Sequence, residues 1–399
     1  MFIGLNNAIT GLTQDQLSKT INSLFSKNEQ GVWYDPSDFS TMLQNAAGTT
    51  PVTAVEQPVG LILDKSNGLV LGPELVTNGD FSQGTTGWTP LAGSQAAENG
   101  ELVLTNPAGG AAITYQAVST QAGKTYRVVA TMRRGTVVSC RLRVGINAGD
   151  SSLGAVESVA TQNETLILHF SASTSASYIR LILPAMTGDE TGYFDNISVR
   201  ELPGNHAKQA TTTSRPTLQQ DSSGKYYLSF DGVDDYLSTG AIDFTGTAKM
   251  TVLAGVRKLS DAANGVVIES STDAGANNGA FEISAPFFPG TNYSFRSGGT
   301  VRVISIATKA APTTDVVSGV NDISGDNAIL RINGAQAAIN TADQGTGNYG
   351  NYPLYIGRRG GTSLPFNGRL YGLVIRGALS STGEIQGSES YMNLHTGAY

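Results

Sequence analysis

Apolar and polar residues alternate in short runs along most of the chain, and a period of two is typical of β-strands with one buried face. The first series of such runs lies between Glu74 and Glu201. About seven or eight strands over that length are the pattern of a β-sandwich. The candidate strands are Glu101 to Thr105, Ala112 to Val118, Thr125 to Met132, Val137 to Ile146, Glu164 to Ser171, Tyr178 to Leu183 and Tyr193 to Arg200.

A second and longer series of strand-like runs extends from Gly204 to Ala378. Turn pairs such as Asp231-Gly232 and Asn367-Gly368 separate these runs, and Asp-Gly and Asn-Gly pairs are strong hairpin signals. We therefore expect a second, larger antiparallel sandwich, and the fold class is all-β. Its candidate strands include Tyr226 to Phe230, Met250 to Arg257, Val266 to Ser270, Phe281 to Ser284, Tyr293 to Arg296, Val301 to Ala307, Asp315 to Val320, Ala328 to Ile332, Pro353 to Gly357 and Arg369 to Arg376.

Two segments have a helical period instead. A short N-terminal helix is predicted over residues 13–26, and a C-terminal helix over residues 380–395. Leu17, Ile21 and Leu24 form one apolar stripe on the first helix, and a helix this short needs a packing partner to be stable. Two interpretations stay open: the stripe packs on its own domain, or residues 1–30 anchor the chain to a larger assembly.

Composition narrows the classes of partner and site. Charged residues are only 14% of the chain and the net charge is −7, which argues against nucleic acid as a partner. The single cysteine, Cys140, excludes an intramolecular disulfide and is predicted to be a buried strand residue. Residues 1–13 lack the features of a signal peptide, and no apolar run approaches the roughly 18 residues of a membrane span, so we expect assembly in a cytoplasm.

Two motifs resemble the first and last strands of jelly-roll carbohydrate-binding modules. They are Asn78-Gly79-Asp80-Phe81-Ser82, followed by Gly87-Trp88, and Tyr193-Phe194-Asp195-Asn196-Ile197-Ser198-Val199. The resemblance implies an inserted jelly roll over residues 67–203. It also implies a structural calcium ion held by Asp80 and Asp195, although Ser82 stands where these modules commonly have Glu.

The flanking residues resemble laminin-G-like, concanavalin A-type sandwiches of phage-encoded proteins. The motifs are Phe230-Asp231-Gly232-Val233-Asp234-Asp235-Tyr236-Leu237, Leu330-Arg331-Ile332-Asn333-Gly334 and Phe366-Asn367-Gly368-Arg369-Leu370-Tyr371-Gly372. In such proteins a run like Gly31 to Ser66 continues directly into one like Gly204 to Ala207. We therefore predict a discontinuous domain of residues 31–66 plus 204–399, interrupted by the jelly roll at an exposed loop.

Exposed aromatic rings are the side chains on which sugars stack, and they define the candidate glycan-binding residues. In the inserted module these are Trp88, Tyr115, Tyr126 and Tyr178, of which Trp88 is more readily interpreted as core. In the outer domain the candidates are Tyr349 and Tyr352. The paired carboxylates Asp234 and Asp235 are a further candidate calcium site, or a solvated turn.

Catalysis is not supported by the sequence. Glycosidases of the concanavalin type need two carboxylates on one strand face, in a Glu-x-Asp-x-x-Glu run that the chain lacks. Glu269 and Glu282 fall on separate candidate strands and are interpreted as solvated strand ends. We therefore expect no enzymatic activity.

The resemblance to phage proteins implies a non-enzymatic structural component of a bacteriophage virion, such as a tail fibre, appendage or decoration protein, assembled in the bacterial host cytoplasm. Its expected partners are other virion proteins and copies of itself. The first alternative is a receptor-binding protein that attaches to a host surface glycan. The second, which the missing carboxylate run disfavours, is a glycan-degrading enzyme.

Overall fold

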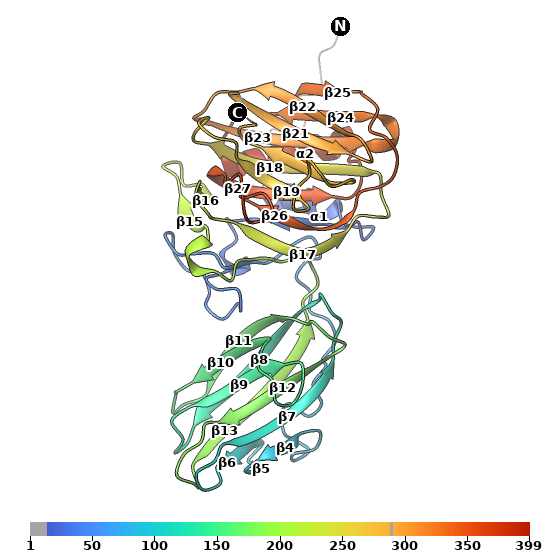
Figure 1. Ribbon diagram of the computed structural model, residues 1–399. Coiled ribbons are helices and arrows are strands. Elements are labelled where there is room, and N and C mark those ends of the chain that lie inside the picture. Colours follow the sequence, from blue (N-terminus) through green and yellow to red (C-terminus); the bar gives the residue numbers. More distant parts are fainter. Residues whose placement is uncertain (1–13, 288–289) are drawn as a thin grey trace. The chain divides into compact units, whose positions relative to one another are not determined.

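The computed structural model describes residues 14–287 and 290–399, which divide into two compact units (Figure 1). The larger unit contains the described residues of 1–45 together with 51–69 and 204–399. The smaller unit contains residues 46–50 and 70–203. Every strand pairing within the described sheets is antiparallel, and the predicted all-β fold class of β-sandwiches is confirmed.

The smaller unit is a sandwich of two five-stranded sheets, ordered β10-β9-β12-β7-β4 and β11-β8-β13-β6-β5. Its strands are β4 (Thr89–Ala92), β5 (Ser94–Glu98), β6 (Glu101–Thr105), β7 (Ala112–Ser119), β8 (Thr125–Arg134), β9 (Cys140–Gly145), β10 (Gly154–Ser158), β11 (Glu164–Ser171), β12 (Ala176–Leu183) and β13 (Thr191–Glu201).

Alternation of side chains creates the core of the smaller unit. On β9, Cys140, Leu142 and Val144 are fully buried, whereas Arg141 and Arg143 between them point to the other face of the sheet. The predicted burial of Cys140 is confirmed, and burial raises the pKa of its thiol to about 12. A protonated, enclosed thiol is inert, so Cys140 is a packing residue.

The larger unit contains an eight-stranded and a nine-stranded sheet. The eight-stranded sheet has the order β15-β16-β27-β18-β23-β24-β25, with β1 also paired to β27. Its strands are β1 (Gly31–Tyr34), β15 (Thr217–Gln220), β16 (Tyr226–Asp231), β18 (Lys249–Lys258), β23 (Thr313–Asp322), β24 (Asn327–Ile332), β25 (Ala335–Asn340) and β27 (Asn367–Arg376).

The nine-stranded sheet has the order β2-β3-β14-β17-β26-β19-β20-β21-β22. Its strands are β2 (Met42–Leu43), β3 (Leu61–Ile62), β14 (Ala207–Lys208), β17 (Leu237–Asp243), β19 (Val266–Ser270), β20 (Phe281–Ser284), β21 (Asn292–Gly298), β22 (Arg302–Thr308) and β26 (Asn351–Ile356). Apolar residues from both sheets, among them Val252, Phe281, Phe295 and Leu373, form one buried core.

Strands from both ends of the chain share the sheets of the larger unit. Strand β1 pairs with β27 through the register Val32↔Ile375, and β3 pairs with β14 through Ile62↔Ala207. A sheet needs neighbouring strands to satisfy its backbone groups, so the segments before and after the smaller unit belong to the same sandwich.

The carboxylate of Asp64 connects the segment at which the chain leaves the larger unit with the segment at which the chain returns to it. Asp64 is fully buried, and its side chain accepts hydrogen bonds from the backbone N–H groups of Trp33 (2.8 Å), Ser66 (2.9 Å) and Asn205 (2.8 Å). The Asp64 N–H in turn donates to Nδ1 of His206 at 2.9 Å. The two stretches that flank the smaller unit therefore lie side by side.

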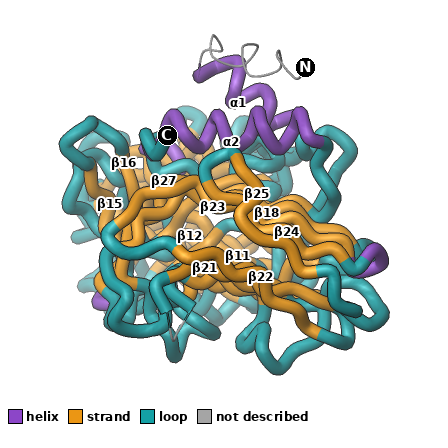
Figure 2. Tube along the Cα trace, turned by 90° about the horizontal axis from the view of Figure 1, so that it is seen from above, coloured by secondary structure: helices purple, strands orange, loops and turns teal. Residues whose placement is uncertain are grey.

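The N-terminal helix packs on its own unit. Helix α1 (Gln14–Ser23) lies beside α2 (Thr382–Thr396) over the eight-stranded sheet (Figure 2), and Thr13, the first residue of the predicted helix, lies outside the described residues. Leu17, Ile21 and Leu24 are at most 2% exposed, in a cluster with Trp33, Leu253, Val374 and Tyr391. The stripe therefore packs on its own domain, as the first interpretation has it, whereas anchoring of residues 1–30 to a larger assembly stays a prediction, because residues 1–13 lie outside the described residues.

The C-terminal helix begins at a complete capping box. The backbone N–H of Ser381 donates to the Glu384 carboxylate (2.6 Å), and the Glu384 N–H donates to the Ser381 hydroxyl (3.3 Å). Gly387 is the point of close approach to α1, since a Cβ atom there would lie 3.0 Å from Cγ2 of Thr20. The glycine that weakens this helix intrinsically thus lets the two helices pack closely.

Candidate functional site

The structure buries three of the six aromatic side chains predicted to bind glycans. Trp88 is 4% exposed, packs on Phe81, and donates from Nε1 to the Asn78 carbonyl at 3.2 Å. Tyr126 is 2% exposed and stacks on Phe170 with ring centroids 5.4 Å apart. Neither ring presents a free face, so their assignment to sugar stacking is wrong: Trp88, directly before β4, and Tyr126, on β8, both belong to the sandwich core.

The two candidates in the larger unit also have internal partners. Tyr349 is 1% exposed; its hydroxyl lies 2.6 Å from Oγ of Ser297 and accepts from Nδ2 of Asn321 at 2.7 Å. Burial raises the pKa of Tyr349, which is a core residue and not a sugar platform. Tyr352 is half-buried, and its hydroxyl donates to the Asn278 carbonyl at 3.0 Å.

The remaining two candidates, Tyr115 and Tyr178, form a pair on the outward face of the smaller unit. They come from the neighbouring strands β7 and β12, their ring centroids are 5.7 Å apart, and the ring planes are tilted by 43°. Thr114 and Gln116 point inward, so Tyr115 between them points outward and is half-buried. Ile179, next to Tyr178, is likewise buried in the core.

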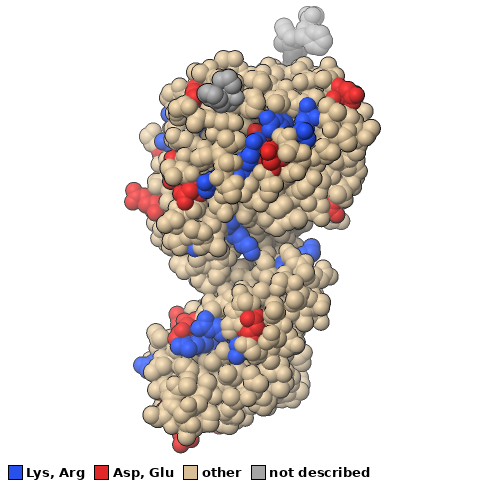
Figure 3. All heavy atoms as spheres, viewed as in Figure 1, with Lys and Arg blue, Asp and Glu red and all other residues tan. Residues whose placement is uncertain are grey.

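Three arginines share this sheet face with the tyrosines. Arg180 stands opposite Tyr115 on one side and opposite Arg143 on the other, while Arg141 stands opposite Ile182. Nε of Arg141 lies 3.2 Å from the Glu157 carboxylate on β10. Charged atoms of both signs gather on the face of the smaller unit that carries β9, β10 and β12 (Figure 3).

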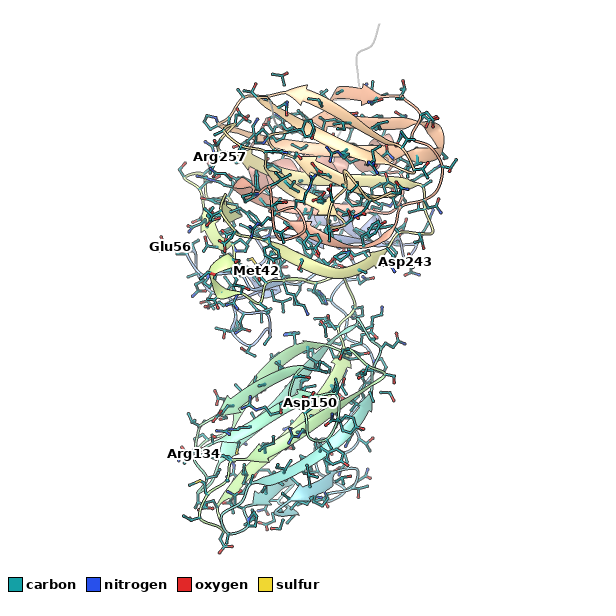
Figure 4. The ribbon with its side chains drawn as sticks, viewed as in Figure 1. Met42, Glu56, Arg134, Asp150, Asp243 and Arg257 are labelled. Atoms are coloured by element: carbon teal, nitrogen blue, oxygen red, sulfur yellow. The ribbon has the colours of Figure 1, made fainter. Side chains whose placement is uncertain are left out.

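A loop between β9 and β10 holds one of these arginines in place. Nη1 of Arg180 donates to the carbonyls of Gly149 (3.3 Å) and Asp150 (3.0 Å) and to the Ser151 hydroxyl (2.9 Å). Figure 4 shows Asp150 over this sheet. Arg180 is 7% exposed, and burial together with the positive charge of Arg143 lowers its pKa.

The arrangement suits a sugar chemically. Aromatic rings offer flat apolar surface, and guanidinium groups offer several N–H donors in one plane that match carboxylates and hydroxyls. The sequence analysis did not single out the arginines, although alternation within Val137 to Ile146 already places Arg141 and Arg143 on one strand face. Only the pairing of β9 with β12 brings them beside Tyr178 and Arg180.

The predicted metal ligands fall in two places. Among the described residues, the one group of three or more potential ligands joins Asp231, Asp234 and Asp235, whose carboxylate oxygens lie within 4.8 Å of one another. Asp231, at the preceding Asp-Gly turn, was not a predicted ligand. Hard carboxylate oxygens are the donor type that calcium prefers, so the chemistry of this group fits the ion.

The three carboxylates of this cluster repel one another. Burial, followed by the charges of Asp231 and Asp234, raises the pKa of Asp235 to about 7. The Ser214 hydroxyl donates to Asp234 at 2.7 Å, and the Asp231 N–H donates to Asp235 at 3.1 Å. Calcium binding by Asp234 and Asp235 stays a prediction.

In the smaller unit, Asp80 and Asp195 each have local partners. Oδ1 of Asp80 accepts from the Ser82 N–H at 3.2 Å, and Asp195 accepts from both nitrogens of Asn196 at 2.7 and 2.8 Å. Burial raises the pKa of Asp195, and the charge of Asp80 adds to the effect. Within the described chain no third His, Cys, Asp or Glu side chain forms a group with these two carboxylates, and calcium binding by Asp80 and Asp195 stays a prediction.

The two glutamates considered for catalysis are not solvated. Glu269 on β19 and Glu282 on β20 are cross-strand neighbours, and both are 0% exposed, which corrects their interpretation as strand ends in water. Arg359 pairs with both carboxylates, and Nη1 of Arg296 lies 3.2 Å from Glu282. Burial and the like charge of Glu282 raise the pKa of Glu269, and the arginines make the burial of two carboxylates tolerable.

The two described α-helices have 10 and 15 residues. No helix in the described part of the chain combines the length and the apolar composition that crossing a membrane requires.

Comparisons with known proteins found one family model and several solved structures that are similar to parts of the chain. Residues 231–386 match the family model of the concanavalin A-like lectin/glucanases superfamily, whereas the comparison with curated proteins gave no match. Among solved structures, a CBM4 domain is similar at 14% identity and a TM-score of 0.28, covering 32% of this chain and 99% of the other.

Two further solved structures are similar to parts of the chain. Domain 4 of AbnA, a GH43 extracellular arabinanase from Geobacillus stearothermophilus in complex with arabinotriose, has 14% identity and a TM-score of 0.35, covering 44% and 81% of the two chains. The CBM40 of Ruminococcus gnavus IT-sialidase, bound to α2,3-sialyllactose, has 16% identity and a TM-score of 0.29, covering 35% and 82%. Residues 231–386 are thus similar to the concanavalin A-like lectin/glucanases superfamily.

Proposed function

We propose that this chain is a non-enzymatic, glycan-binding component of a bacteriophage virion, and that the outward face of the sheet β10-β9-β12-β7-β4 is its glycan-binding face. The observation that carries the binding proposal is the pairing of Tyr115 with Tyr178 beside Arg143 on one open sheet face. A half-buried aromatic pair, with ring planes tilted by 43°, beside planar donors offers both kinds of contact that a sugar ring needs, apolar surface for its faces and donors for its hydroxyls.

The charge of this face favours acidic saccharides. Arg141, Arg143 and Arg180 lie on neighbouring strands, where Glu157 acts on the first two and Asp150 on the third, so three positive charges meet two negative ones. A carboxylate on a sugar gains charge-assisted hydrogen bonds from a guanidinium, which are roughly twice as strong as neutral ones. We expect a uronic acid to bind more tightly than the neutral sugar of the same ring.

The other two parts of the proposal have separate support. The full burial of Glu269 and Glu282, each paired with arginine, supports the absence of catalysis, because a glycosidase needs carboxylates that reach the substrate. The virion assignment rests on the resemblance of the sequence motifs to those of phage-encoded proteins.

Binding is tested with the full chain on an array of neutral and acidic glycans, followed by calorimetry with the best hit. The double variant Tyr115→Ala/Tyr178→Ala removes the aromatic platform and is expected to lose at least about tenfold in affinity, or about 1.4 kcal/mol. The matched control Tyr115→Phe/Tyr178→Phe keeps both rings and is expected to bind like the parent chain. Equal binding by the alanine variant, or no glycan bound at all, contradicts the proposal.

The virion assignment is tested on purified phage particles from a host that expresses this chain. Peptide mass spectrometry is expected to find the chain in particles after density-gradient purification, and gold-labelled antibodies are expected to mark one location on them. Recovery only in the soluble lysate contradicts the assignment and leaves the glycan-binding proposal intact.

A further inference from the structure

The loop of residues 146–153, which joins β9 to β10, folds back over the outward face of the smaller unit. Two contacts fix its position. A Cβ atom at Gly145 would lie 2.2 Å from the Asp150 carbonyl oxygen, so a glycine there lets the loop approach the strand. At Arg180, Nη1 donates to two loop carbonyls and to the Ser151 hydroxyl.

Both contact points lie next to the tyrosine pair. In the strand registers Gly145 stands opposite Tyr178, and Arg180 stands opposite Tyr115. Residues that stand opposite each other in an antiparallel sheet have Cα atoms about 4.5–5.5 Å apart. The loop therefore borders the tyrosine pair on the side of β9.

Internal hydrogen bonds hold the loop in one shape. The Asp150 carboxylate accepts from the Ile146 N–H at 2.8 Å and from the Ser152 hydroxyl at 2.5 Å. These two bonds lower the pKa of Asp150 to about 2, so the carboxylate is ionised at neutral pH. The Gly149 N–H donates to Oδ1 of Asn147 at 2.9 Å. The loop is thus ordered by its own bonds, which reduces the conformational freedom that a ligand would have to remove.

Arg180 is the one of the three arginines on this face that the loop covers. Arg180 is 7% exposed, and all three of its hydrogen bonds described above go to the loop. Arg141 and Arg143, by contrast, are only half-buried. A saccharide can therefore reach the guanidinium groups of Arg141 and Arg143, whereas it meets the loop above Arg180.

Ser151 is the side chain that Arg180 orients within the loop. Ser151 is exposed, and its oxygen accepts from Nη1 of Arg180 at 2.9 Å. Because the oxygen is the acceptor in this bond, the hydroxyl proton of Ser151 points away from Arg180 and is available as a donor. The hydroxyl, ring and carboxylate oxygens of a saccharide are all acceptors for such a proton.

We propose that Arg180 is a positioning residue of the glycan-binding face, and that the Ser151 hydroxyl, held by Arg180 beside the tyrosine pair, donates a hydrogen bond to the bound saccharide. The inference rests on the proposed glycan-binding function and deepens it, because it gives the arginines different roles. Arg141 and Arg143 face the ligand, whereas Arg180 acts only through the loop. A ligand on the tyrosine pair must then present an oxygen acceptor toward β9.

The test measures binding of the best array glycan to the full chain by calorimetry, together with hydrogen exchange of residues 146–153. Ser151→Ala removes one exposed hydroxyl and is expected to weaken binding about fivefold without changing thermal stability. Arg180→Lys keeps the charge but loses the planar fork of donors. It is expected to speed exchange in the loop at least about tenfold and to weaken binding about fivefold.

Two further variants separate positioning from direct contact. Ser151→Ala/Arg180→Lys is expected to bind like Arg180→Lys alone, because a residue that acts through another adds nothing once the other is removed. Gly145→Ala displaces the loop while Arg180 stays in place, and is also expected to weaken binding about fivefold. If Arg180 were itself a ligand contact, Gly145→Ala would uncover it, and tighter binding of acidic glycans would result.

The matched controls lie on the other sheet of the smaller unit. Ser94→Ala on β5 and Arg127→Lys on β8 are expected to bind and exchange like the parent chain. Should Arg180→Lys fail to fold, Ser151→Ala and Gly145→Ala carry the same test.

The outcomes distinguish this inference from the proposed function. The inference is overturned if the parent chain binds glycan but Ser151→Ala binds equally well, if the losses in the double variant add, or if Gly145→Ala binds acidic glycans more tightly. If the parent chain binds no glycan, the proposed function fails and the inference fails with it.

Discussion

At the scale of single residues, several buried carboxylates of the larger unit are held by local hydrogen-bond or ion-pair partners. Arg359 pairs with Glu269 and Glu282 on two neighbouring strands. The Asp64 carboxylate accepts hydrogen bonds from the N–H groups of Trp33, before the inserted unit, and Asn205, after it. Taking an ion out of water costs several kcal/mol unless its partners replace the lost hydration. These residues consequently govern stability, in contrast to the half-exposed tyrosines of the smaller unit.

Removal of the shared arginine is expected to destabilise the larger unit. Arg359→Ala leaves two carboxylates facing each other without water, and such broken pairs cost about 3–5 kcal/mol. The matched control is Arg358→Ala, because Arg358 is its neighbour in the same turn and donates to the Thr362 carbonyl on the surface. Urea unfolding measures the free energy of unfolding of both variants. If Arg359→Ala loses no more of it than Arg358→Ala does, the structural role of Arg359 between Glu269 and Glu282 is contradicted.

The stability of the larger unit is expected to depend on the ionisation of Asp235. A folded-state pKa of about 7, above the usual carboxyl value, means that folding favours the protonated form. The contribution of protonated Asp235 to the free energy of unfolding is therefore complete below about pH 4 and is lost as the pH rises to 7. After solvent screening it amounts to about 1 kcal/mol.

Thermal melts of Asp235→Asn and the parent chain at pH 5 and pH 8 measure this effect. The parent is expected to lose more stability than the variant on going to pH 8, and added calcium is expected to reverse the loss only in the parent. Parallel pH profiles for the two chains would show that Asp235 is not the group responsible.

At the scale of elements, the strands that the sequence predicted are those with an alternating apolar face. The interval Glu164 to Ser171 coincides with β11, and Thr125 to Met132 is β8 without its last two residues. Strands β5 and β25 were missed because most of their residues are exposed at sheet edges, where burial imposes no apolar period.

Helix α1 is expected to contribute stability through its buried stripe. Ile21 is 0% exposed, and Ile21→Ala is expected to cost about 2–4 kcal/mol in the free energy of unfolding because it leaves a cavity. Asn22→Ala on the exposed side of the helix is the control, with an expected change within about 0.5 kcal/mol. If Ile21→Ala unfolds like the parent but is no longer incorporated into particles, the stripe has an external partner after all.

At the scale of the whole molecule, one sandwich interrupts the chain of another. The backbone N–H of Asn205 donates to the Asp64 carboxylate at 2.8 Å, and β3, before the interruption, pairs with β14, after it. An insertion at such a point adds a domain without breaking a sheet, because the host strands keep their partners.

A shortened chain that joins Ser66 directly to Gly204 is therefore expected to fold, with a cooperative thermal transition and the circular dichroism of a β-protein. The excised segment 67–203 is expected to fold alone, since both of its five-stranded sheets are complete. A chain that joins Asn45 to Gly204 lacks β3 and serves as the control, with an expected loss of soluble protein. If the first chain and the isolated segment are both unfolded, the nested arrangement is wrong.

Alternation along the chain was sufficient to determine the all-β class and most central strands, because the period of a strand with one buried face is local in sequence. Which tyrosines remain accessible was decided only by the tertiary structure: Tyr115 and Tyr126 occupy similar alternating runs, yet one faces outward and the other stacks on Phe170. The loop over Arg180 likewise takes its place only because β9 and β12 pair. Side-chain exposure depends on which elements pack together, and that depends on contacts far apart in sequence.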